Sequence, residues 1–496
     1  MTEMMKHAPE TAVLLQALSK GLREEGISGI SYSLEETRRR TTSVRGGMSY
    51  TRTDAEDSLL VIKGCVDGRE VSVSFTEFPD AKTAAHMLQE NAAVMAAANA
   101  ESGADTQLSE KRDEQQLQKR AEKETGAFAK EAEADEQAVS GAADLADFET
   151  HEAVETVLLD AERAAFALPE TALVDLCRYE QEQKLVRLFS ENGSILLSDA
   201  SGYRCMRTAV IAKAERAAAD RPNEREESTE YTFGCRYGSS VGDTKAAALC
   251  RETAELAAGG LFGASLPSGV YPAVLKNSVV AELLEAYLPA FYAENLKEGQ
   301  SALCGLKGKA AAADFLSLRE VPFLSGGRVT RRVDDEGTPV REKYLLKNGI
   351  FETALSKRGS TPEEDGESTG NGFRPDAQSD IGTGVTNVLL LADAEHTKPL
   401  SELLSAMQDG LYVTAIDGTF AGTDAKKGSF SLIARGRVVR GGRLCESFRE
   451  VTIAGSFFEM LLQAKALGDE PAATAPDLAC VLAPALFAGD LVVSGV

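Results

Sequence analysis

The sequence predicts an α+β fold in two parts, an N-terminal domain of sheet plus helices and a β-rich C-terminal domain. In the first half, patterns typical of amphipathic helices alternate with runs typical of strands. After residue 266, strand patterns and glycines dominate. Between the halves, Gly259–Gly269 contains four glycines and a proline, a composition typical of a linker. We therefore expect domains at residues 1–260 and 266–496.

The N-terminal domain begins with a predicted helix over Thr11–Glu25, where apolar residues recur at helical spacing. A second helix is expected at Ala81–Ala98. Asp67-Gly68, between two runs of alternating polarity, is a typical hairpin turn. The strands expected between the helices are Gly29–Leu34, Thr41–Thr51, Ser58–Val66 and Glu70–Glu77.

The segment Glu101–Thr150 is rich in charged residues, glutamine and alanine and poor in large apolar residues. It cannot bury enough apolar area to offset the conformational entropy lost on folding. We predict either a long solvated helix or a disordered insertion, and we assign it no chemistry.

The rest of this domain should contain three helices and four strands. The helices are predicted at Glu152–Ala165, Glu170–Tyr179 and Asp243–Ala258. The strands are predicted at Leu185–Ser190, Ile195–Met206, Arg207–Ala214 and Glu230–Tyr237, with a charged loop at Arg221–Thr229 before the last.

The C-terminal domain should contain mostly strands and one long helix near its start. The helix is expected at residues 278–296, where apolar residues recur about every four positions. Pro289 lacks a backbone donor and disfavours helical geometry at Leu288, so the helix should kink or end there. The predicted strands are Val270–Leu275, Val340–Lys347, Ile350–Leu355, Val385–Leu391, Leu411–Ile416, Phe430–Arg435, Arg437–Arg440 and Leu478–Phe487.

Charge and composition exclude several classes of protein. With 77 acidic and 53 basic residues the formal net charge is −24, so direct binding to nucleic acid is not expected. No apolar run approaches the ~18 residues of a membrane span. The first residues, MTEMMKHAPETAVLL, lack the features of a secretory signal. Eight scattered cysteines without a C-x-x-C pair indicate reduced thiols, so we expect a cytoplasmic protein.

Four short motifs follow the predicted helix in a fixed order. They are DDEGTP at Asp334–Pro339, STGNG at Ser368–Gly372, GLYVT at Gly410–Thr414 and EVTIAG at Glu450–Gly455. Together with the helix and the strand before it, they resemble the TldD/PmbA family. Its members are known as metalloproteases and as modulators of DNA gyrase. The resemblance implies the α+β fold of that family, with the β-rich C-terminal domain carrying the metal-site helix.

In TldD-type members that helix carries H-E-x-x-x-H, with two histidine zinc ligands around a glutamate. The matching positions here run from Leu284 to Pro289, so Glu285 retains the glutamate and both histidines are absent. Asp424 lies near the position of the family's cysteine ligand. A hydrolytic zinc site needs three protein ligands and an open position, so we expect no metal in this chain.

The resemblance therefore identifies a PmbA-type (TldE-type) subunit. It implies a dimer with a TldD-type partner that holds the zinc, acting on peptides or unfolded proteins in the cytoplasm. Glu285 is then a degenerate motif residue rather than a base. The loop Gly370–Arg374 is a candidate contact for peptide or partner through Asn371 and Arg374, and the alternative, which we favour, is a tight turn between strands.

Other motifs support weaker alternatives. His151-Glu152 begins like a metalloprotease helix but lacks a second histidine at Glu155 or Thr156. Ser240 lies in a G-x-S-x-G pattern between a predicted strand and helix, and a triad could draw only on His396 downstream. The remaining histidines, His7 and His86, are isolated. The alternatives to the subunit are a stand-alone binding or regulatory protein and, less favoured, a hydrolase that uses Ser240.

Overall fold

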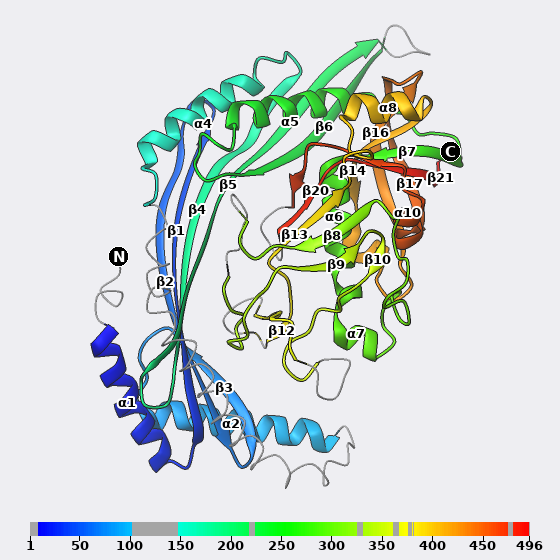
Figure 1. Cartoon of the computed structure of the whole chain (residues 1–496). Coiled ribbons are helices and arrows are strands. Elements are labelled where there is room, and N and C mark those ends of the chain that lie inside the picture. Colours follow the sequence, from blue (N-terminus) through cyan, green and yellow to red (C-terminus); the bar gives the residue numbers. More distant parts are fainter. Residues whose placement is uncertain are drawn as a thin grey trace.

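The computed structural model describes residues 8–101, 147–217, 224–324, 331–360, 367–374, 379, 381–474 and 480–495. It confirms the predicted α+β class. A long, curved antiparallel sheet with helices on one face wraps around a β-rich C-terminal part (Figure 1).

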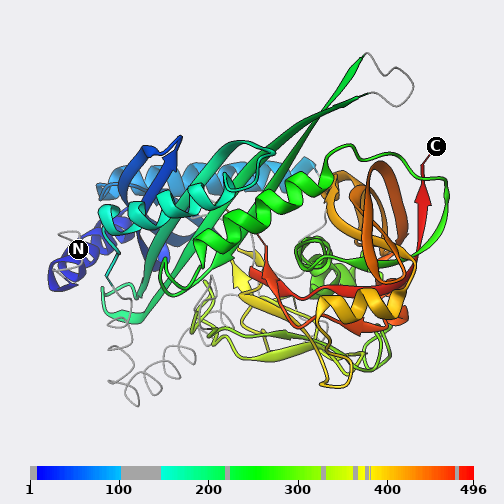
Figure 2. The same ribbon diagram turned by 90° about the horizontal axis from the view of Figure 1, so that it is seen from above.

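The N-terminal sheet has six strands in the order β3-β2-β1-β4-β5-β6. All neighbours are antiparallel. Several strands are far longer than the average of about five or six residues. Their bounds are β1 Ser28–Arg45, β2 Met48–Val66, β3 Arg69–Phe75, β4 Thr171–Phe189, β5 Ile195–Ala217 and β6 Arg225–Tyr237. Beyond the body of the molecule, β5 and β6 continue as a projecting two-stranded ribbon (Figure 2).

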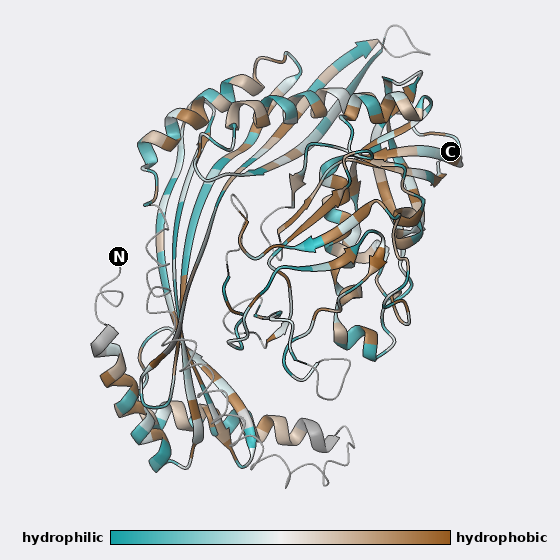
Figure 3. Ribbon diagram, in the orientation of Figure 1, coloured by the Kyte–Doolittle hydropathy of each residue, from teal (hydrophilic) through white to brown (hydrophobic). Residues whose placement is uncertain are grey.

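Two pairs of helices pack on the ends of this sheet and leave its middle polar. Helices α1 (Ala8–Glu24) and α2 (Ala81–Glu101) enclose one apolar cluster with β1, β2 and β3. Helices α4 (His151–Ala165) and α5 (Ala246–Gly260) enclose another with β4 and β5. Between the clusters the strands are hydrophilic (Figure 3).

Strands β1 and β5 each join stretches that were predicted as separate strands, and two further predictions in this sheet are wrong. Thr41–Thr51 is not one strand, because the chain turns at Gly46-Gly47 between β1 and β2. Both glycine N–H groups donate to the buried Glu162 carboxylate, at 2.7 and 2.8 Å. Glu170–Tyr179 is not a helix but the start of β4. Register shifts between Thr171/Leu173 and Val174/Leu176 give its buried residues a spacing of three, which imitates a helix.

The C-terminal part combines a barrel with a second sheet. Pairings run through β14, β7, β21, β17 and β16, and a β14–β16 pairing closes the ring. The barrel strands are β7 Gly269–Leu275, β14 Gly410–Asp417, β16 Ser429–Arg440, β17 Arg443–Ser456 and β21 Leu486–Ser494, with β15 Thr423–Asp424 and β18 Ala466–Leu467 at the side.

The second sheet has the order β10-β9-β8-β13-β20-β19. Its strands are β8 Leu316–Glu320, β9 Lys343–Lys347, β10 Ile350–Phe351, β13 Asn387–Ala392, β19 Ala472–Ala473 and β20 Cys480–Ala483. A separate pair joins β11 (Gly372–Phe373) to β12 (Gly382–Thr383). The short helices of this part are α8 Leu400–Met407, α9 Thr419–Gly422 and α10 Phe457–Gln463.

Most of the predicted C-terminal strands exist, with two differences. Phe430–Arg435 and Arg437–Arg440 form a single strand, β16, and the strand predicted at Leu478–Phe487 covers the whole of β20 and the start of β21. The sequence patterns did not predict strands β8 and β17 or helices α8 and α10. The division into domains 1–260 and 266–496 stays a prediction. Most of the segment Glu101–Thr150 lies outside the described residues. Among the helices that are described, none has the length and apolarity to cross a membrane.

Candidate functional site

The predicted helix follows β7 and is broken at the expected place. Helix α6 spans Asn277–Tyr287, a 3₁₀ turn follows at Leu288–Phe291, and a short helix, α7, spans Ala293–Lys297. Pro289 sits in the first turn of the 3₁₀ segment, where its missing N–H costs no hydrogen bond. The prediction that the helix kinks or ends at Pro289 is confirmed, whereas the single helix expected at residues 278–296 is wrong, because the chain forms three shorter pieces there.

The motif end of α6 is packed as a core. Leu284, at the position of the first histidine, is 1% exposed and belongs to the large apolar cluster of the C-terminal part. Tyr287 is fully buried, with its ring stacked on Phe457 at 4.3 Å between centroids. Its hydroxyl donates to the Ser429 carbonyl at 2.5 Å. This end of the helix is held by apolar packing and by the part-buried hydrogen bond of Tyr287.

Glu285 is partly buried on the polar side of the same turn. The Thr474 hydroxyl donates to its Oε1 at 3.3 Å. Close by, Tyr292 lies among the carboxylates of Glu285, Glu294 and Glu320, and burial followed by these charges raises the pKa of its phenol. The structure thus places Glu285 beside other acids and a threonine.

Asp424, near the position of the family's cysteine, is used by its own turn. One carboxylate oxygen accepts from the backbone N–H groups of Lys426 and Lys427, each at 3.0 Å. The hydrogen bond from the Lys427 N–H is the main cause that lowers the pKa of Asp424. The carboxylate therefore stabilises the turn between β15 and β16.

These residues do not fit a zinc site. Leu284 and Pro289 offer no donor atom, and the Asp424 carboxylate already accepts two backbone hydrogen bonds. Within the described parts of the chain, no group of three or more His, Cys, Asp or Glu residues is arranged to hold a metal ion.

Asn371 lies at the centre of a buried polar network. Both Asn371 and Glu320 are fully buried. The Asn371 amide donates to both Glu320 carboxylate oxygens at 3.1 Å and to the Gly384 carbonyl at 2.8 Å. Its oxygen accepts from Lys343 at 2.9 Å and from a threonine hydroxyl at 2.7 Å. Lys343 also pairs with Glu320 at 2.7 Å.

The rest of the Gly370–Arg374 loop is fixed by the DDEG turn. Asp334 accepts from the N–H groups of Gly372, at 2.9 Å, and Thr338, at 2.8 Å. The backbone N–H of Arg374 donates to Asp335 at 2.8 Å. Gly370 has φ +74°, and a side chain there would meet the Pro339 carbonyl oxygen at 2.4 Å. These contacts favour a structural role for the loop, and its role toward peptide or partner stays a prediction.

The other candidate motifs have local roles. The His151 ring contacts the Thr42 hydroxyl at 2.8 Å at the start of α4. The Ser240 hydroxyl accepts from the Asp243 N–H before α5. His396 pairs with Asp393 and stacks on Phe315, in the C-terminal part. His86 is exposed beside Glu90, and His7 lies outside the described residues.

The sequence analysis missed the buried pair Glu320–Lys343 and the contact of Thr474 with Glu285. Lys343 is 23 positions from Glu320, and Thr474 is 189 positions from Glu285. No local sequence pattern marks either pair.

Comparisons with known proteins agree on one family. A profile of the PmbA/TldA metallopeptidase C-terminal domain matches residues 268–495. A metalloprotease TldD homolog of Buchnera aphidicola is 23% identical over 49% of this chain and 50% of its own length. A metalloprotease PmbA homolog of Haemophilus influenzae is 25% identical over 66% of each chain. The chain spans about half the length of the first curated relatives it matches.

Solved structures share the fold over nearly the whole chain. TldE from Thermococcus kodakarensis has a TM-score of 0.72 at 17% identity, covering 97% of this chain and 99% of that one. A candidate modulator of a DNA gyrase from Thermotoga maritima also has a TM-score of 0.72, at 20% identity, covering 98% and 100%. At these identities the likeness establishes the fold alone.

Proposed function

The chain belongs to the TldD/PmbA metallopeptidase family, and we propose that it is the PmbA-type (TldE-type) subunit of a metalloprotease complex. In this proposal the chain itself holds no zinc, and a TldD-type partner supplies the metal. The complex hydrolyses peptides or unfolded proteins in the cytoplasm, a location that the eight free cysteines favour.

The observation that supports this proposal is the state of the motif end of α6. A zinc-binding helix must direct donor atoms toward an open position where water can bind. Here Leu284 is buried in the core and Tyr287 is stacked on Phe457. A single histidine at position 284 could not restore a site, because a hydrolytic zinc site needs three protein ligands and Pro289 offers no donor atom.

The test is to purify this chain alone, a TldD-type chain alone, and the two together. Elemental analysis should find no stoichiometric zinc in this chain. Hydrolysis of an unstructured peptide should be undetectable with this chain alone, should appear in the mixture, and should be abolished by a chelator.

Three results would contradict the proposal. Tightly bound zinc at a one-to-one ratio in this chain would show that we have missed a metal site. Chelator-insensitive hydrolysis by this chain alone would favour a self-sufficient hydrolase. Failure to bind any TldD-type chain at micromolar concentration would favour a stand-alone binding or regulatory protein.

A further inference from the structure

A cavity of about 360 Å³ lies at the other end of α6, where the N-terminal sheet meets the C-terminal barrel. Strand β6 and helix α5 form one side, and β14, β16, β17 and the first turns of α6 form the other. This volume is in the range of small-ligand sites, which occur preferentially where two structural parts meet. Its apolar walls include Tyr231, Phe233, Leu256, Val279 and Phe448.

Part of the charge in this cavity is already compensated. Arg435 is 3.1 Å from Glu230 and 3.1 Å from Asp417, so these three side chains form one ion-paired group. This group joins β6 of the sheet to β14 and β16 of the barrel and fixes one wall of the cavity.

Two other charged side chains of the cavity, Lys276 and Glu282, are held by hydroxyl groups, and the nearest opposite charges, Glu252 and Arg435, act on them without a direct ion pair. Lys276 donates to the Ser278 hydroxyl at 2.8 Å, and Glu282 accepts from the Thr419 hydroxyl at 3.2 Å. Neither side chain forms an ion pair with any residue in the described parts of the chain. Burial lowers the pKa of Lys276 to about 8 and raises the pKa of Glu282. Both groups are therefore charged at a cost that a ligand of opposite charge would reduce.

The spacing of the two residues guides the choice of ligand. Lys276, the residue before α6, and Glu282 are six positions apart, which places their backbones about 9 Å apart along the helix axis at about 1.5 Å per residue. An extended peptide advances about 3.3–3.6 Å per residue, so two to three residues cover this distance. Lys276 also lies at the N-terminal end of α6, where the helix dipole favours an anion.

We propose that this cavity binds a short peptide with free ends, about two to three residues long. Its terminal carboxylate contacts Lys276 and its terminal ammonium contacts Glu282. The half-exposed rings of Tyr231 and Phe233 cover the peptide's side chains. The site lies wholly within this chain, so it does not depend on the proposed subunit role.

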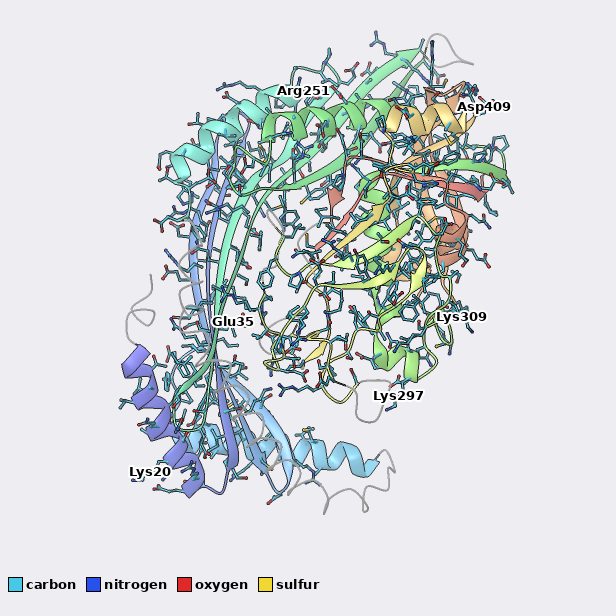
Figure 4. All side chains as sticks on the ribbon, viewed as in Figure 1. Lys20, Glu35, Arg251, Lys297, Lys309 and Asp409 are labelled. Atoms are coloured by element: carbon cyan, nitrogen blue, oxygen red, sulfur yellow. The ribbon has the colours of Figure 1, made fainter. Side chains whose placement is uncertain are left out.

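The test is isothermal titration calorimetry of the whole purified chain with unblocked trialanine. We expect saturable binding, and at least tenfold weaker binding of N-acetyl-trialanine and of trialanine amide. Lys276→Met and Glu282→Gln should each weaken binding of the unblocked peptide at least tenfold. Lys297→Met and Glu298→Gln are matched controls, since both residues are exposed beyond the far end of α6; Lys297 is labelled in Figure 4.

Several outcomes would overturn the proposal. They are no binding of trialanine at millimolar concentration, binding of N-acetyl-trialanine and trialanine amide as tight as that of trialanine, or full binding by both cavity variants. If trialanine amide binds more weakly but N-acetyl-trialanine does not, the cavity recognises only a carboxylate, and the proposal that it binds both free ends is wrong. Thermal unfolding checks that each variant is folded. If one is not, the discrimination between free and blocked peptides by the parent chain decides the question without any variant.

Discussion

The two ends of α6 have opposite characters. At the motif end, Leu284 and Tyr287 are buried in a packed core. Glu320, one of the acids around Tyr292, is also fully buried and is bonded to Asn371 and Lys343. At the other end, Lys276 and Glu282 border a cavity. The part of the helix that the family motif marks is therefore closed here, and the part that no motif marks is open to a ligand.

This difference predicts how the two ends respond to substitution. Changes at the closed end should lower the free energy of unfolding, because they leave cavities or unsatisfied polar groups. Changes at the open end should affect ligand binding and leave stability equal or higher. The following predictions test this contrast from the largest expected effect to the smallest.

Tyr287→Ala should have the largest effect on stability. It removes a fully buried ring that stacks on Phe457, and such truncations cost about 3–5 kcal/mol. Tyr287→Phe keeps the ring and removes only the hydrogen bond to the Ser429 carbonyl, so it should cost about 1 kcal/mol. Urea unfolding of the two variants measures both values. A cost below 1 kcal/mol for Tyr287→Ala would mean that the motif end is not a tight core.

Asn371→Ala should be the next most damaging change. It leaves the buried Glu320 and Lys343 with fewer partners, at a cost of about 2–4 kcal/mol. Arg374→Ala should stay within about 0.5 kcal/mol of the parent, because the contact with Asp335 uses the backbone N–H. If Asn371→Ala were as stable as the parent but the assembled complex lost activity, the loop would contact peptide or partner instead.

Lys276→Met should raise the free energy of unfolding at neutral pH, whereas the two changes above lower it. The folded-state pKa of Lys276, about 8, is below its ordinary value, so folding disfavours the charged amine at neutral pH. This penalty disappears as the amine loses its proton in both states. Between pH 8 and pH 10.5 the free energy of unfolding of the parent should therefore rise by about 1–3 kcal/mol more than that of the variant. Urea unfolding of both proteins across this pH range measures the difference. A constant difference would mean that Lys276 is not desolvated.

The sequence predicted the fold where the burial pattern was regular. The four-residue spacing along α6 and the break at Pro289 are local properties, and both are present in the structure. The start of β4 was misread because β-bulges changed the spacing of its buried residues. Strand β1 was read as two pieces because its middle is polar on both faces and gives no alternation of apolar residues.

The candidate sites show a similar limit. The loss of both histidines was visible in the sequence, but the packing of Leu284 and the use of Asp424 by its own turn depend on tertiary contacts. Asn371 was selected for its glycine neighbours, although its partners come from segments 28 and 51 residues away. The cavity at Lys276 could not be inferred, because its walls come from six elements spread over more than two hundred residues.

Glu285→Gln should have the smallest effect, and it tests whether the motif glutamate still has a role. The amide keeps an oxygen to accept from Thr474 and removes one of the negative charges near Tyr292. The free energy of unfolding should change by less than about 0.5 kcal/mol. Peptide hydrolysis by the assembled complex should stay within a few-fold of the parent, since no metal-bound water is expected beside this residue.

The matched control is Glu298→Gln, an exposed glutamate beyond α7. Loss of a general base usually costs on the order of 10²–10⁴-fold in rate. A drop of that size for Glu285→Gln, with assembly and stability unchanged, would show that Glu285 is a working catalytic residue. The closed end of α6 would then not be inert, and the contrast between its two ends would have to be abandoned.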